Sequence, residues 1–126
     1  MATRSTITLV TSEGNIESIY CHWDGYLSGV GLGLLDYINT PDKVRALINE
    51  GNRSALGVAP YYQTEGWEGN RPACFIEPQE YNYVWEEAKG AWSVFSMHMD
   101  GADEYADRVK LTRNLISQRE LDEVLG

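Results

Sequence analysis

The sequence predicts a single α+β domain over residues 1–126, with an antiparallel sheet built from two hairpins and packed against three or four short helices. Two pairs of segments with period-two alternation predict the hairpins, and helix start and stop signals lie between and after them. This order of strands and helices is typical of an α+β domain. With 126 residues, of which 43% are hydrophobic, the chain is long enough to bury one core.

The first hairpin is predicted from residues 6–10 and 16–21. Thr6, Thr8 and Val10 alternate with apolar neighbours, as in a strand with one buried face. Residues 12–15 form a turn cluster that contains glycine, and branched and aromatic residues resume after it. We therefore expect two antiparallel strands at the N-terminus.

Two helices are predicted next. Residues 29–38 carry apolar side chains every four positions, although three glycines interrupt the pattern and each costs up to about 1 kcal/mol in a helix. We expect these glycines to allow close packing or unusual backbone angles. The second helix begins after Thr40 with Pro41 and Asp42, carries a stripe of apolar residues, and ends at Gly51.

The second half of the chain is predicted to be strand-rich. Residues 54–72 are mostly irregular, although 56–58 are a candidate short strand, and strands are expected at 73–76, 81–86 and 91–97. The last two strands flank a turn and form the second hairpin. A helix is expected over residues 100–110 from the distribution of its charges. A capping box at 117–120 predicts a short final helix.

Composition excludes several classes of protein. No apolar run approaches the roughly 20 residues of a membrane-spanning helix, and the N-terminal residues lack the apolar core of a signal peptide. Two cysteines suit a reducing compartment, so we expect a cytoplasmic protein. The 19 acidic residues outnumber the 10 basic ones and give a net charge of −9, which disfavours direct binding to nucleic acid or anionic membranes.

The acidic residues suggest a surface for a basic partner. Many of them fall between positions 77 and 107, where Lys89 is the only lysine. A solvated surface with no partner is the simpler interpretation of the same residues. Aromatic side chains in the irregular segment either pack inward or contact a partner. The candidate partner-binding residues are Glu77, Glu80, Glu86, Glu87, Asp100, Asp103, Glu104, Asp107, Tyr61, Tyr62 and Trp67.

The segment Cys21–Gly33 is the other candidate site. Strand alternation separates the side chains of Cys21 and His22, which disfavours a catalytic pair. No short Cys-x2-Cys spacing indicates a metal, and the glycines do not match a phosphate-binding loop, so we expect no catalytic residue, metal or cofactor. We expect Trp23 to pack in the core between the hairpin and the first helix.

These residues also carry a resemblance. The motifs Tyr20-Cys21-His22-Trp23-Asp24-Gly25-Tyr26 and Ser28-Gly29-Val30-Gly31, with Tyr81-x-Tyr83-Val84-Trp85 and Gly90-x-Trp92 later, resemble a family of small uncharacterised phage and prophage proteins. The similarity covers roughly residues 5–57 and is sparse over 58–80. It implies a phage or mobile-element origin, and it implies no catalytic residues.

Three classes of function follow. The first is a phage accessory protein that is not an enzyme and inhibits a host defence complex of the CRISPR or restriction type by binding a basic protein or ribonucleoprotein surface. The second is a small enzyme or a small-ligand or nucleotide-binding protein that uses the Cys21–Gly33 segment. The third is an accessory protein that assembles with itself, for example as a homodimer.

Overall fold

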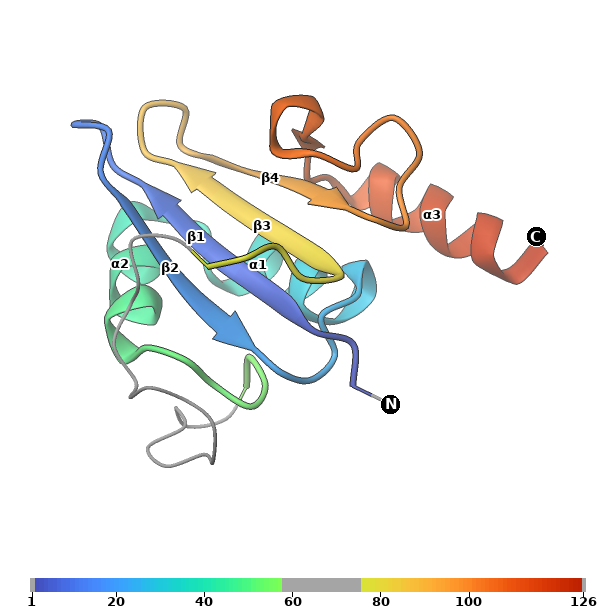
Figure 1. Cartoon of the computed structure of the whole chain (residues 1–126), viewed down its shortest axis with the longest axis horizontal. Helices are drawn as coiled ribbons and strands as arrows, with labels where there is room; N and C mark the ends of the chain where they lie inside the picture. The colour runs from blue at the N-terminus through green and yellow to red at the C-terminus, as the bar shows by residue number, and fades with distance from the viewer. Residues whose placement is uncertain (1, 58–75, 126) are drawn as a thin grey trace.

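Five strands form one mixed sheet in the computed structural model, which describes residues 2–57 and 76–125 (Figure 1). The order of strands across the sheet is β2-β1-β3-β4-β5. Their bounds are β1 Ser5–Val10, β2 Ile16–Cys21, β3 Tyr81–Glu86, β4 Ala91–Ser96 and β5 Val109–Lys110. The two hairpins predicted from the sequence correspond to β1–β2 and β3–β4, and both are antiparallel.

The prediction of a wholly antiparallel sheet is wrong, because β1 and β3 pair in parallel. Ser5 is opposite Tyr81 and Val10 is opposite Glu86, so all six residues of each strand are paired. Parallel neighbours need a long connection, and the helices after β2 lie within that connection. The two hairpins are therefore joined side by side in one α+β domain.

Two α-helices cover one face of the sheet, behind the strands in Figure 1. A π-helical turn at Leu27–Gly31 leads directly into α1 (Leu32–Tyr37), and α2 (Pro41–Glu50) follows. The predicted helix over residues 29–38 thus consists of this turn and α1. The helix predicted after Thr40 is also confirmed, since the Thr40 side chain accepts a hydrogen bond from the Lys43 backbone N–H.

The region from residue 97 to the C-terminus differs from its prediction. The expected helix over 100–110 is absent from this described segment, which contains a 3₁₀ turn at Tyr105–Asp107 and then β5. Burial of Met99 and Ala102 and the pairing of β5 with β4 outweigh the helix-favouring charges. The final helix, α3 (Arg113–Leu125), begins before the predicted capping box.

An alternative cap explains the earlier start of α3. The Thr112 side-chain oxygen accepts a hydrogen bond from the Leu115 backbone N–H at 3.1 Å. Of the strand predicted at 73–76, only Ile76 lies in the described residues, and it is not in a strand. In the other short candidate, 56–58, Leu56 lies in a turn and residue 58 lies outside the described residues.

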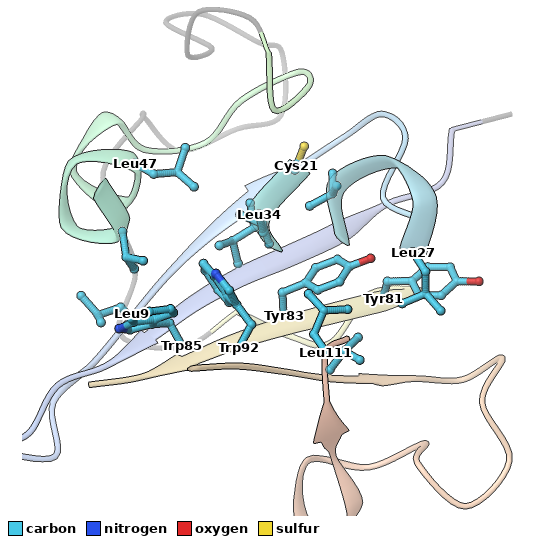
Figure 2. Close-up of a cluster of buried hydrophobic side chains, with 14 of the residues drawn as sticks. Leu9, Cys21, Leu27, Leu34, Leu47, Tyr81, Tyr83, Trp85, Trp92 and Leu111 are labelled. Carbon is cyan, nitrogen blue, oxygen red and sulfur yellow. The ribbon is translucent and has the colours of Figure 1, made fainter. Parts of the chain in front are cut away.

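The core lies between the sheet and the two helices (Figure 2). Alternate residues of the four long strands point into it, as the period-two pattern predicted. Strand residues of the core are Ile7, Leu9, Ile19, Cys21, Tyr81, Tyr83, Trp85, Trp92 and Val94, and they meet Leu27, Val30, Leu34, Val44, Leu47 and Ile48 from the helical side. Trp92 also donates a hydrogen bond from Nε1 to the Ile38 carbonyl at 2.8 Å, which ties β4 to the end of α1.

The turn between β2 and the π-helical turn packs without space for side chains at its glycines. The fully buried Tyr83 donates a hydrogen bond from its hydroxyl to the Gly25 carbonyl at 2.7 Å. A Cβ atom on Gly25 would lie 2.7 Å from Ser5 Cβ and 2.8 Å from the Thr3 carbonyl oxygen. Glycine is therefore required at position 25 by close packing.

None of the helices in the described ranges has the length and apolar character needed to cross a membrane.

The close packing predicts a stability loss for Gly25→Ala. Overpacking against backbone atoms is expected to lower the free energy of unfolding by about 1–3 kcal/mol, measured by urea denaturation. Gly57→Ala is the matched control, because its Cβ would meet no atom of the described residues within 4 Å. This control should change the stability by less than about 1 kcal/mol. An equal loss in both variants would contradict the packing explanation.

Candidate functional site

The Cys21 thiol is buried in the core and is poorly suited to act as a nucleophile. Burial raises its pKa from 9.0 to about 11, although the nearby Arg53 guanidinium partly opposes the shift. The thiol lies 3.7 Å from the Trp23 carbonyl oxygen. His22 is directed elsewhere, since its Nδ1 lies 2.8 Å from the Tyr20 hydroxyl. The structure therefore places these two side chains apart, as strand alternation predicted.

Protein atoms fill the space beside the glycines of this segment. A Cβ atom on Gly29 would lie 2.2 Å from the Asp24 carbonyl oxygen, and one on Gly31 would lie 3.1 Å from the Tyr83 hydroxyl. On Gly33 it would lie 2.5 Å from a methyl group of Leu56. The glycines thus bring the helical segment close to the sheet and to the residues after α2. Of the two roles expected from the sequence, close packing applies rather than unusual backbone angles, since Gly29, Gly31 and Gly33 do not have a positive φ.

No group of three or more His, Cys, Asp and Glu side chains in residues 2–57 and 76–119 is arranged to hold a metal ion. The two histidines contact different residues, since His22 Nδ1 lies 2.8 Å from the Tyr20 hydroxyl and His98 Nε2 lies 3.4 Å from a Glu80 carboxylate oxygen. Cys74 lies outside the described residues.

The expectation that Trp23 belongs to the core is wrong. Its side chain is 45% exposed, and its ring packs edge-on against His22 with 4.8 Å between the centroids. Asp24 has a φ of +59°, a conformation that few residues other than glycine adopt, and accepts a hydrogen bond from the Tyr26 hydroxyl. This left-handed residue changes the chain direction, which explains why Trp23 points outward rather than between hairpin and helix.

The predicted acidic residues divide into two groups. The first group makes ion pairs or backbone hydrogen bonds within the chain. Glu86 pairs with Arg108 and Lys89, while Glu87 pairs with Arg45 and accepts a hydrogen bond from the Ser12 backbone N–H. Glu80 belongs to the same group because it accepts from the Arg4 backbone N–H and contacts His98.

These contacts change the acidity of two carboxyl groups. Partial burial alone would raise the pKa of Glu86, but hydrogen bonds and charge from Arg108 and Lys89 outweigh it and lower the pKa. The Ser12 N–H and the Arg45 guanidinium lower the pKa of Glu87. Both glutamates therefore stabilise the fold at neutral pH.

The second group of acidic residues is exposed. Glu77, Asp100, Asp103, Glu104 and Asp107 have no cationic partner among the described residues. Four of them lie in the connection between β4 and β5, which we name the acidic connection (residues 97–108). The predicted aromatic residues Tyr61, Tyr62 and Trp67 lie outside the described residues.

A groove adjoins the acidic connection on the face of the sheet opposite α1 and α2. Its volume is about 350 Å³. Its floor consists of outward-facing strand residues, and its two walls are residues 76–78 before β3 and residues 103–105 of the acidic connection. The segment before β3 crosses in front of the strands in Figure 1. Asp103 and Glu104 thus lie at the margin of a groove as well as on an exposed loop.

Sequence reasoning did not identify this groove. Its signal was present, because Val10, Ile16, Val84 and Phe95 are apolar residues at positions that the alternation assigns to the face away from the core. The walls come from loops far apart in the sequence, and no local pattern predicts that they lie on the same face.

Comparison of the chain with protein-family models, with curated proteins and with solved structures gave no match.

The raised pKa of Cys21 predicts a loss of stability at alkaline pH. The unfolded thiol loses its proton near pH 9, whereas the folded thiol keeps it to about pH 11. The stability is therefore fully present below pH 9 and falls by about 2–3 kcal/mol as the pH rises through 11. Urea denaturation is measured at pH 8, about one unit below the pKa of the unfolded thiol, and at pH 10.5, about half a unit below the pKa of the folded thiol. Between these two pH values, the stability of Cys21→Ala should fall less than that of the unmodified protein. Equal falls would contradict the assignment, and Tyr83, whose pKa burial also raises, contributes to the fall in both proteins.

The ion pairs predict that Glu86 and Asp100 contribute differently to stability. Since the pKa of Glu86 is lowered in the fold, its contribution is present above pH 4.5 and is lost as the pH falls through the lowered value. Glu86→Gln should be less stable at neutral pH and should lose less stability on acidification. Asp100→Asn is the control and should change neither quantity. Urea denaturation at neutral and acidic pH measures both, and equal effects would contradict the division into two groups.

Proposed function

We propose that this chain is a binding protein, not an enzyme, that uses the acidic connection to occupy a basic surface on a partner protein. In its most specific form, the chain is a phage or mobile-element product of the anti-CRISPR or anti-restriction type, acting in the cytoplasm of the bacterial host. One observation carries the proposal. The fold neutralises Glu86 and Glu87 with arginines but leaves Asp100, Asp103 and Glu104 exposed and unpaired among the described residues.

Electrostatics supports a basic partner. Nucleases and ribonucleoproteins line their nucleic-acid grooves with Lys and Arg, which neutralise phosphates. Carboxylates held on a protein surface compete for the same cations, and a net charge of −9 attracts such a surface from a distance. This mode of inhibition requires complementary charge and shape rather than a reacting group.

Charge reversal tests the proposal. The variant Asp103→Lys/Glu104→Lys should lose capture of its partner from nuclease-treated bacterial lysate, and capture by the unmodified chain should weaken as salt is raised. The matched control is Glu13→Lys/Glu17→Lys, which changes the net charge equally at exposed residues away from the acidic connection. Retention of the same partner by both variants would contradict a role for the acidic connection.

A functional measurement extends the test to defence. The chain is expressed in bacteria that carry either an RNA-guided nuclease or a restriction enzyme, and plating of a targeted phage is counted. We expect the unmodified chain and the Glu13→Lys/Glu17→Lys control to restore plating against one of these systems, and Asp103→Lys/Glu104→Lys to fail. No restoration against either class would contradict the inhibitor form of the proposal.

A further inference from the structure

The groove beside the acidic connection has an apolar lining of limited size. Val10, Ile16, Ile76, Val84 and Phe95 contribute apolar surface from four strands and from the segment before β3. The volume of about 350 Å³ is near the lower limit for ligand pockets, and an apolar cavity of about 150 Å³ holds one benzene ring. The groove therefore has room for one large or two small apolar side chains.

The polar side chains in the floor already have partners. Thr6 donates to the Asn82 side-chain oxygen at 2.9 Å, and the Thr8 and Ser18 hydroxyls lie 2.7 Å apart. The Asn82 amide nitrogen donates to the Gln79 carbonyl at 2.9 Å. An occupant with many hydrogen-bonding groups would leave those groups unpaired on this floor, which costs free energy. The floor therefore favours an apolar group.

The margin of the groove favours positive charge. Asp103 and Glu104 line it directly and are exposed. Arg108 is the cation nearest in sequence, but its guanidinium pairs with Glu86 and stacks over the Tyr105 ring at 4.1 Å. It therefore leaves the two carboxylates of the margin unpaired among the described residues.

We propose that the groove binds an extended segment of the basic partner protein, which inserts one large apolar side chain and places Lys or Arg residues beside it. This inference rests on the proposed function and specifies how the partner is recognised. Burial of the apolar side chain supplies affinity, while the flanking cations pair with Asp103 and Glu104 and fix the position of the segment.

Synthetic peptides test the proposal on the full chain. The probe has a central tryptophan with two lysines and an arginine around it, and binding is measured by fluorescence anisotropy of a dye at its end. One control peptide replaces the tryptophan with serine, and another replaces the basic residues with glutamate. We expect each control to bind at least about tenfold more weakly, because each lacks one of the two recognised features.

Variants of the protein locate the binding. Ile16→Ser/Ile76→Ser removes apolar surface from the floor and from one wall of the groove without changing charge, and should weaken binding of the tryptophan peptide by about tenfold or more. Trp23→Ser/Tyr37→Ser removes exposed aromatic side chains that do not line the groove, and should leave binding unchanged. Urea denaturation verifies that all variants are folded.

The outcomes separate this inference from the proposed function. No binding of the tryptophan peptide at about 1 mM, or equal binding by its serine counterpart, overturns the groove inference. A different outcome separates the two proposals: Asp103→Lys/Glu104→Lys loses partner capture, but Ile16→Ser/Ile76→Ser binds the tryptophan peptide as tightly as the unmodified chain. This result overturns the groove inference and supports the role of the acidic connection. Unchanged capture by Asp103→Lys/Glu104→Lys contradicts the proposed function itself.

Discussion

The parallel pairing of β1 with β3 is the constraint on which the rest of the structure depends. It joins residue 5 to residue 81 and so unites two hairpins that would otherwise be separate two-stranded units of marginal stability. The joined sheet buries the core-facing aromatic residues Tyr83, Trp85 and Trp92 beneath α1 and α2, which belong to the connection between the paired strands. Those helices occupy one face, and the groove lies on the opposite face between residues 76–78 and residues 103–105.

The same pairing determines which acidic residues are neutralised. The turn of the second hairpin follows β3 directly and lies next to the end of β1, so Glu87 reaches the Ser12 backbone N–H. Arg45 of α2 pairs with the same carboxylate at 2.8 Å and links the helix to the ends of both strands. The acidic connection lies beyond β4, and none of its four acidic residues has a cationic partner in the described part of the chain. Position in the fold, rather than local sequence, therefore separates the two groups.

Sequence reasoning identified the parts of the structure that depend on neighbouring residues. The alternation in β1–β2 and β3–β4, and the cap at Thr40, are local and were predicted. The parallel register depends on contacts between residues more than seventy positions apart, and no period in the sequence specifies it. Trp23 was misplaced because its exposure follows from the left-handed backbone of Asp24, which aspartate adopts only occasionally. The acidic residues of the candidate site were recognisable individually, whereas their ion-pair partners and the groove arise only from tertiary structure.

The acidic connection is held in place although its charges repel one another. Met99 and Ala102 are almost fully buried within it, and the Ser96 backbone N–H donates to the Ala102 carbonyl at 3.0 Å. Tyr105 packs edge-on against Phe95 and anchors the other end. Burial of a side chain such as that of Met99 contributes about 1.5–3 kcal/mol, which exceeds the repulsion between solvated carboxylates. A loop ordered in this way loses little conformational entropy on binding, so more of the energy of its charge contacts is retained as affinity.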